Sequence, residues 1–177
     1  MKITAVKTLW PENKDFRIVR ENTGNQYIFI HFLTPSNVIL NGNSISVLEG
    51  SCILYDKFSY QDVYQNDYDL IHDWFHLEGD MDNIIRKYGF EYNTLYKVSN
   101  SNKITKMIQS IENEFISKQK FSNALNELKI EELIISIIRG IEDKHKNKFI
   151  KADTRKAFFE LRSKINLTYN EDWDVDK

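Results

Sequence analysis

Cysteine, glycine and proline are scarce in this sequence. It contains one cysteine, Cys52, together with six glycines and two prolines among 177 residues. A single cysteine excludes a disulfide within the chain and indicates a reducing, cytoplasmic location. The few glycines form no phosphate-binding loop, and no serine lies in a Gly-x-Ser-x-Gly turn. The sequence therefore offers no motif for nucleotide binding or for a serine nucleophile.

Long apolar segments and a strong charge imbalance are absent as well. No run approaches the roughly 18 apolar residues that a membrane-spanning helix needs, and the N-terminal residues lack the apolar core of a secretory signal. The formal net charge is −2, which is not the basic surface expected of a domain that holds nucleic acid by itself. With 41% hydrophobic and 28% charged residues, the composition predicts a soluble globular chain.

Residues 1–98 carry the short patterns of β strands. The segment YIFIHFL (27–33) is aromatic and β-branched, and SISVL (44–48) alternates between apolar and polar positions. Asn41 and Gly42 predict a tight hairpin turn, because both residues tolerate positive φ. Short strands separated by tight turns predict an antiparallel sandwich or barrel.

After residue 102 the apolar residues recur with a helical period. Ile104, Met107, Ile108, Ile111 and Phe115 share one helix face. A second helix is predicted at 122–145 and a third at about 152–166. The second carries apolar residues on two faces. One face holds Ile130, Leu133, Ile134, Ile137, Ile138 and Ile141, and the other holds Phe121, Leu125, Leu128 and Ile135. Two apolar faces imply two partners, unless the helix breaks near Lys129.

The segment LIHDWFH (70–76) combines histidine, aspartate and tryptophan, so it is the main candidate for a functional site. On a helix, His72 and His76 would form a zinc pair. On a strand they would lie about 13 Å apart at about 3.3 Å per residue, which is too far for one zinc ion bound at about 2.0 Å. Because the surrounding residues favour a strand, we expect no metal site and no catalytic site here.

A strand offers a different role for these residues. His72, Trp74 and His76 share one strand face, while Asp73 and Phe75 share the other. An indole beside an imidazole provides a flat apolar surface and a directed hydrogen bond, which suits the wall of a ligand pocket. Ordinary core packing is the alternative interpretation, and the sequence does not determine which face points inward.

The order of several segments resembles the N-terminal effector-binding and dimerisation domain of AraC-type transcriptional regulators. The segments are YIFIHFLTP, ILNG, EGSCILYDKFSYQDVY and LIHDWFHLEG, and the C-terminal FFELRSKINLTYNEDWDVDK resembles the start of the family's DNA-binding module. The resemblance implies an α+β fold, in which a cupin-like antiparallel β barrel (a double-stranded β-helix) is followed by dimerising helices. It implies an effector-binding barrel at residues 1–98 and a dimerisation element at 99–147. A linker helix and a truncated helix-turn-helix module are expected at 148–177.

The same resemblance implies roles for particular residues. The arabinose-responsive member of the family presents a His-x-Trp pair to its sugar, so His72 and Trp74 are expected to bind the effector, with His76 beside them. Tyr64 is the nearest counterpart of a tyrosine on the preceding strand. Arg17 and Arg20 are candidate substitutes for the family's sugar-binding arginine. Leu133, Ile134, Ile137, Ile138 and Ile141 are expected to serve the core and the dimer interface together.

These observations lead to three hypotheses for function. The first is a cytoplasmic, homodimeric sensor without a cofactor, which binds a small polar metabolite such as a sugar and reaches DNA only through a module beyond this chain. The second is a small metal-dependent cupin enzyme, such as a sugar isomerase or dioxygenase, which requires convergent metal ligands. The third is a dimerisation module whose barrel binds nothing.

Overall fold

The computed structural model describes residues 1–65 and 68–146, with side chains up to residue 141. The chain divides into two units, Met1–Glu142 and Asp143–Lys177. The strands and helices discussed below belong to the first unit, except for the last four residues of the final helix. The predicted helix at 152–166 and the predicted start of a DNA-binding module lie outside the described residues.

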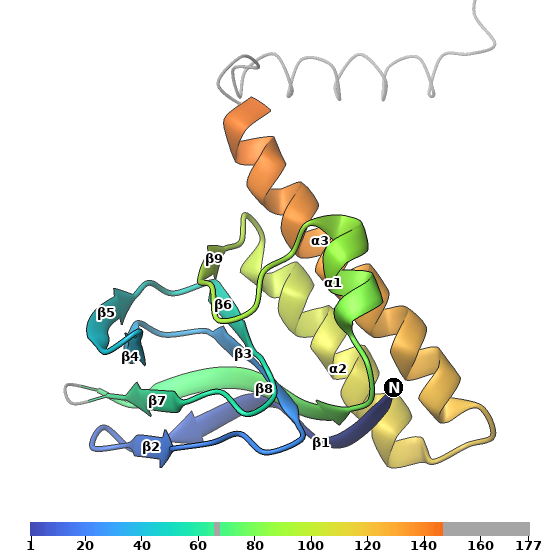
Figure 1. The fold of residues 1–177 in the computed structure, drawn as a ribbon, viewed down its shortest axis with the longest axis horizontal. Coiled ribbons are helices and arrows are strands. Elements are labelled where there is room, and N and C mark those ends of the chain that lie inside the picture. Colours follow the sequence, from blue (N-terminus) through green and yellow to red (C-terminus); the bar gives the residue numbers. More distant parts are fainter. Residues whose placement is uncertain (66–67, 147–177) are drawn as a thin grey trace, which may run out of the picture. The chain divides into compact units, whose positions relative to one another are not determined.

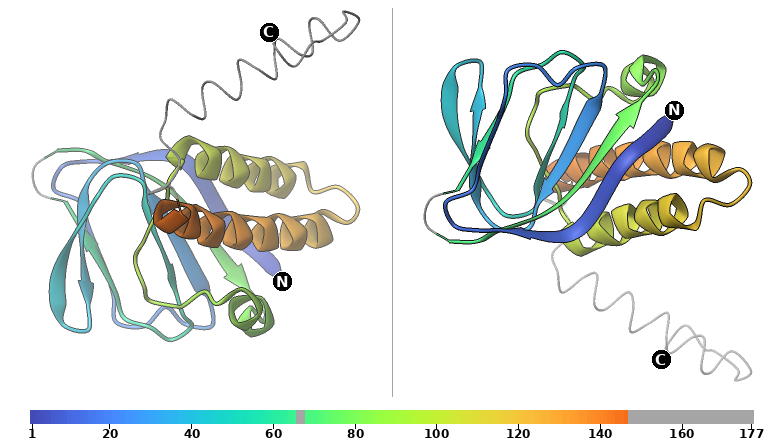
Figure 2. Two further views of the ribbon diagram at one scale, coloured as in Figure 1. Left: turned by 90° about the horizontal axis from the view of Figure 1, so that it is seen from above. Right: turned by 90° about the horizontal axis from the view of Figure 1, so that it is seen from below.

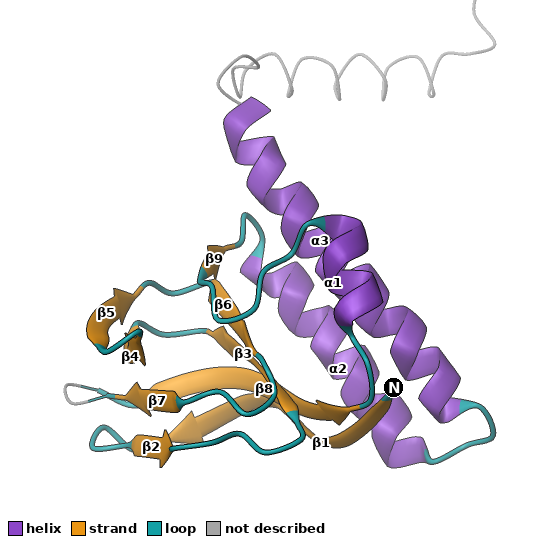
Figure 3. Cartoon of the chain, viewed as in Figure 1, coloured by secondary structure: helices purple, strands orange, loops and turns teal. Residues whose placement is uncertain are grey.

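Strands precede the two long helices along the chain, as the change of period predicted (Figure 3). The strands are β1 (Lys2–Glu12), β2 (Arg17–Arg20), β3 (Tyr27–Phe32), β4 (Ser36–Leu40), β5 (Asn43–Val47), β6 (Ser51–Tyr55), β7 (Gln61–Tyr64), β8 (Leu70–Glu78) and β9 (Tyr96–Lys97). The helices are α1 (Asp82–Tyr88), α2 (Ser101–Ser117) and α3 (Ser122–Lys146). None of these helices has the length and apolar character needed to cross a bilayer.

The strands form two antiparallel sheets. The larger sheet has the order β1-β8-β3-β6-β9 and the smaller one β2-β7-β4-β5. Both sheets end in edge strands, so hydrogen bonds do not close the described strands into the predicted cupin-like barrel. The fold is therefore α+β, with two facing sheets arranged like a sandwich and helices after them (Figure 1).

The larger sheet is covered on both faces, and β3 lies at its centre with every residue buried. Phe29 belongs to the core on the helical side. Ile28, Ile30 and Phe32 belong to the core between the two sheets. Because both faces of β3 are buried, its sequence is an almost continuous apolar run rather than an alternating one.

Helices α2 and α3 run side by side against the larger sheet (Figure 2). The predicted stripe of α2 is confirmed, because Ile104, Ile108 and Ile111 are buried in the core on that side. Asn100 caps this helix, since its side chain accepts a hydrogen bond from the backbone N–H of Lys103 at 3.0 Å.

The predicted Asn41-Gly42 turn is also confirmed. Asn41 and Gly42 join β4 to β5 with φ values of 52° and 76°, the left-handed backbone that such a hairpin turn requires. Cys52 is fully buried in β6, where it packs as a small apolar side chain.

Helix α3 continues through Lys129 without a break, so both of its apolar faces exist. Leu133, Ile134 and Ile137 are buried in the core of this same chain, and Ile138 and Ile141 pack against that core. Packing in the core accounts for the burial of Leu133, Ile134 and Ile137. A part for these residues or for the partly buried Ile138 and Ile141 in a dimer interface stays a prediction. Three residues of the predicted second face, which we call the outer stripe, are exposed: Phe121 in the turn before α3 is 68% exposed, and Leu125 and Leu128 on α3 are 43% and 62% exposed. The fourth, Ile135, is partly buried.

Two leucines of α3 provide a direct test of this division. Replacing the buried Leu133 with alanine should lower the free energy of unfolding by about 2–5 kcal/mol, because the substitution removes apolar contacts and leaves a cavity. Replacing the exposed Leu128 with alanine should change it by about 0.5 kcal/mol or less when unfolding is measured at a concentration at which the chain is monomeric. Urea unfolding of the two variants measures the difference, and equal losses would contradict the placement of α3.

Candidate functional site

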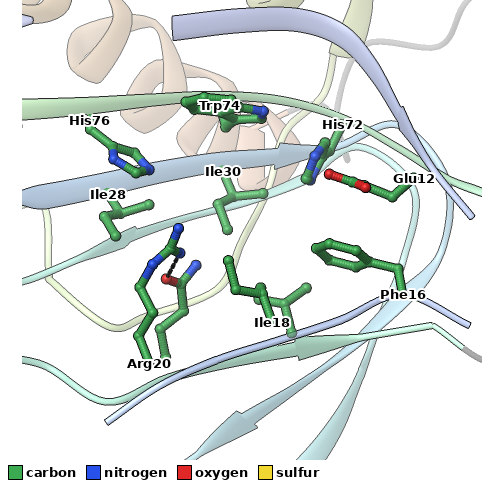
Figure 4. Close-up of a pocket in the computed structure, with 11 residues that line it drawn as sticks. Glu12, Phe16, Ile18, Arg20, Ile28, Ile30, His72, Trp74 and His76 are labelled. Carbon is green, nitrogen blue, oxygen red and sulfur yellow. Dashed lines mark hydrogen bonds between the residues drawn. The ribbon is translucent and has the colours of Figure 1, made fainter. Parts of the chain in front are cut away.

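Strand β8 presents its alternate residues to two different environments. It pairs with β1 on one side and with β3 on the other. Phe75 and Leu77 pack in the core beneath the helices. His72, Trp74 and His76 point the other way, into a cavity (Figure 4). The sequence did not determine which face of this strand points inward. In the structure, the face that carries His72, Trp74 and His76 points inward, between the two sheets.

The cavity has a volume of about 130 Å³ and receives side chains from both sheets. Its lining consists of Glu12 from β1, Phe16 after it, Ile18 and Arg20 from β2, Ile28 and Ile30 from β3, Gln61 and Val63 from β7, and His72, Trp74 and His76 from β8. Most of these side chains are apolar. The few polar groups are the carboxylate, the guanidinium, the amide and two imidazoles, which is the usual composition of a small-molecule site.

Both imidazoles are uncharged at neutral pH. Burial lowers the pKa of His72 to about 4, although the charge of Asp73 opposes the shift. Burial also lowers the pKa of His76 to about 4, and the positive charge of Arg20 adds to the effect. His72 is only 6% exposed, and neither of its ring nitrogens has a hydrogen-bond partner among the described residues. A buried polar group without a partner costs about 1–3 kcal/mol, so His72 can gain from a ligand that supplies one.

Four of the six residues predicted to bind the effector line the cavity, namely His72, Trp74, His76 and Arg20. The indole of Trp74 lies beside the His76 imidazole, with ring centroids 5.1 Å apart. The Arg20 guanidinium donates a hydrogen bond to the side-chain oxygen of Gln61. Ligand binding by these residues stays a prediction.

Arg17 and Tyr64 are absent from the cavity lining. Arg17 forms an ion pair with Asp62 at 2.7 Å, and the Tyr64 hydroxyl lies 2.6 Å from the hydroxyl of Ser44. The period of two explains their placement. Arg17 is three residues from Arg20 and Tyr64 is one residue from Val63, so each points to the opposite side of its strand from a cavity residue.

A buried hydrogen-bond network lies behind the cavity, and no pattern in the sequence predicted it. The Asp73 carboxylate accepts from the backbone N–H of Leu9 at 2.8 Å, the Thr105 hydroxyl at 2.7 Å and His31 Nδ1 at 2.9 Å. A carboxylate has no hydrogen to donate, so Nδ1 must carry one. In that tautomer His31 Nε2 accepts from the Ser101 hydroxyl at 3.0 Å. Asp73 thereby connects β8 to β1, β3 and α2.

The same network stabilises an irregularity in β1. The pairing of β1 with β8 shifts register between Lys7 and Trp10, and Leu9 adopts a φ of 51°. That backbone region is unfavourable for a residue with a branched side chain. The bond from the Leu9 N–H to Asp73 compensates for part of this strain.

The described residues do not form a metal centre. No group of three or more histidine, cysteine, aspartate or glutamate side chains converges in that part of the chain. Along the extended strand β8, Asp73, Trp74 and Phe75 separate His72 from His76.

Comparison with protein families identifies the type of domain. A model of the ExsA N-terminal regulatory domain matches residues 30–152, which is more than half of the chain. The chain belongs to the ExsA N-terminal regulatory domain family. The resemblance to AraC-type regulators is thereby confirmed, and this ExsA-type domain is a regulatory domain rather than an enzyme.

Similarity to solved structures is weak. ToxT from Vibrio cholerae O395 bound to (E)-4-(8-methylnaphthalen-1-yl)but-3-enoic acid is 15% identical, with 96% of this chain and 67% of that chain covered and a TM-score of 0.45. Wild-type ToxT from V. cholerae strain SCE256 bound to an unsaturated fatty acid is 12% identical, with coverages of 93% and 64% and a TM-score of 0.43. The plu4264 protein of Photorhabdus luminescens is 15% identical, with coverages of 40% and 58% and a TM-score of 0.35.

The chain thus spans 58–67% of the length of these three structures. No curated protein matches it. The assignment of the ExsA-type domain rests on the family match.

Removing the carboxylate of Asp73 should destabilise the domain strongly. Asp73→Ala leaves the donors on Leu9, His31 and Thr105 unmatched, and we expect the free energy of unfolding to fall by about 3–5 kcal/mol. The exposed Asp69, at the start of the same segment, provides the control, and Asp69→Ala should cost about 0.5 kcal/mol or less. Urea unfolding measures both values. A loss below about 1 kcal/mol for Asp73→Ala would contradict the importance of this network.

Proposed function

We propose that this ExsA-type domain binds a small effector in the cavity lined by His72, Trp74 and His76, and that binding controls a helix-turn-helix module of the same regulator. The observation that carries the proposal is the unpartnered His72 imidazole, which is buried in a cavity formed by both sheets. A group of this kind inside a mixed apolar and polar cavity is typical of a ligand site.

The residues that line the cavity indicate which type of effector it favours. A sugar carries hydroxyl groups around its whole ring, and each one needs a hydrogen-bond partner when it leaves water. Here Phe16, Ile18, Ile28, Ile30 and Val63 supply apolar wall, and the polar groups lie toward the ends of the cavity (Figure 4). This arrangement favours a molecule with an apolar body and polar ends over the sugar suggested by the resemblance.

Control of DNA binding requires the effector to prefer one arrangement of the regulator over another, because equal affinity shifts nothing. The position of strand β8 provides a way for a bound effector to favour one arrangement. His72 and Trp74 line the cavity, and Asp73 between them is bonded to β1 and α2. A ligand that moves β8 therefore acts on both of these elements. The homodimer expected from the resemblance would let two DNA-binding modules occupy adjacent half-sites.

A fluorescence and thermal-shift screen tests effector binding. The panel contains pentoses, hexoses and small organic acids, and the substitutions Trp10→Phe and Trp173→Phe leave Trp74 as the single indole of the chain. An effector should change the emission of Trp74 and raise the melting temperature, with about 2.7 kcal/mol of added stability at 100 times its dissociation constant. Trp74→Ala should weaken binding at least tenfold. If Trp74→Ala binds the effector with unchanged affinity, the effector does not bind in this cavity. If no compound of the panel binds, the result favours a dimerisation module that has no effector.

The outer stripe of Phe121, Leu125 and Leu128 is the surface that we propose for the dimer. Leu125 and Leu128 are three residues apart on α3, and Phe121 lies in the turn just before this helix. This arrangement suits packing against the same helix of a second copy. Leu128→Glu should convert the dimer to a monomer by placing a charge in an apolar interface. Leu48→Glu alters an equally exposed leucine outside the helices and should leave the dimer intact. Analytical ultracentrifugation distinguishes these outcomes, and a wild-type monomer or a dimeric Leu128→Glu variant would contradict the interface.

A further inference from the structure

Among the described residues that line the cavity, Arg20 is the one with a positive charge at neutral pH, because both histidines are uncharged. The guanidinium is half-buried, and burial lowers its pKa. No carboxylate lies within ion-pair distance of it among the described residues. Arg17, on the same strand, has Asp62 as a partner at 2.7 Å. A partly buried cation without an anionic partner is unfavourable, so Arg20 stands to gain from a negative charge in the cavity.

The acid that lines the cavity does not provide this charge. Glu12 accepts a hydrogen bond from the Trp10 indole at 3.0 Å. Its carboxylate lies near His72, whereas Arg20 lies toward His76 (Figure 4). Gln61 accepts a hydrogen bond from Arg20, but an amide oxygen carries no net charge. The Arg20 end of the cavity therefore remains positive.

We propose that the effector of this cavity is a small organic monocarboxylate whose acid group pairs with Arg20. This inference rests on the effector-binding function proposed above and specifies the class of molecule. A guanidinium and a carboxylate form two parallel hydrogen bonds, which are among the strongest polar contacts in proteins. The neighbouring His76 can donate a further bond to the same group.

The size of the cavity restricts the body of this acid. A cavity of about 150 Å³ in another protein accepts benzene, and the cavity here has a volume of about 130 Å³. An apolar body about the size of a single ring or a short branched chain matches this volume. Ile28, Ile30 and the indole of Trp74 provide flat apolar surface for such a body.

The opposite end of the cavity favours a second polar group on the effector. Both ring nitrogens of His72 are buried without partners in the described part of the chain. A hydroxyl group placed there can donate to one imidazole nitrogen or accept from the other. We therefore expect 4-hydroxybenzoate to bind more tightly than benzoate.

Calorimetric titration of the whole chain with matched compounds tests the inference. The compounds are benzoate, 4-hydroxybenzoate, the corresponding two amides and L-arabinose. Each acid should bind the wild-type chain at least tenfold more tightly than its amide, which has nearly the same shape without the charge. Arg20→Gln should lose at least tenfold in affinity for the acids and little for the amides. Arg17→Gln, which alters the arginine on the outer face, should stay within twofold of wild type.

The outcomes separate this inference from the function on which it rests. If L-arabinose or the amides bind as well as the acids, or if Arg20→Gln binds the acids as the wild type does, the acid class is wrong and effector binding stands. If no compound binds, both proposals fail. Thermal unfolding of each variant identifies misfolded protein. Should Arg20→Gln unfold, Arg20→Lys keeps the charge without the paired geometry, and its affinity for the acids should be reduced but measurable.

Discussion

The architecture depends on the buried carboxylate of Asp73. Asp73 has no exposed surface, and its three donors come from β1, β3 and α2. Burying an ionised carboxylate is unfavourable unless every acceptor site is occupied, so these donors have to stay in place. The alternation of a strand then determines what happens on the other side. Because Asp73 faces the helices, His72 and Trp74 must face the space between the sheets.

The sequence predicted the elements with a strong local signal. The stripe of α2, the extent of α3 and the Asn41-Gly42 turn follow from short-range periodicity and backbone preference. The walls of the cavity could not be found in this way, because β2 and β7 come from a sheet whose pairing partners are distant in the sequence. The alternation of side chains along a strand places Arg20 and Arg17 on opposite faces, but this can be inferred only when the bounds of β2 are known. The His31–Asp73 bond joins residues on separate strands that no local pattern relates.

The two apolar faces of α3 show what periodicity establishes and what it does not. The helical period assigned the apolar residues of this region to two faces, but in the sequence both faces are equally apolar. Only the packing distinguishes them. Leu133 is 0% exposed against α2 and the larger sheet, while Leu128 is 62% exposed. Apolar side chains that stay exposed to water in the single chain mark an interaction surface. Apolar side chains of the same composition that are buried in the core do not.

The placement of charge connects the cavity with the helices. Asp73 supplies a buried negative charge on one side of β8, and Arg20 supplies a positive charge on the other side. The negative charge is enclosed by donors of the fold itself, so it fixes the structure whether or not a ligand is present. The positive charge has only the neutral Gln61 as a partner in the described residues. A negatively charged effector of the kind proposed here would therefore change the electrostatic balance at the Arg20 side. Any displacement of β8 that follows reaches β1 and α2 through Asp73, because their donors cannot leave that carboxylate without a large loss of free energy.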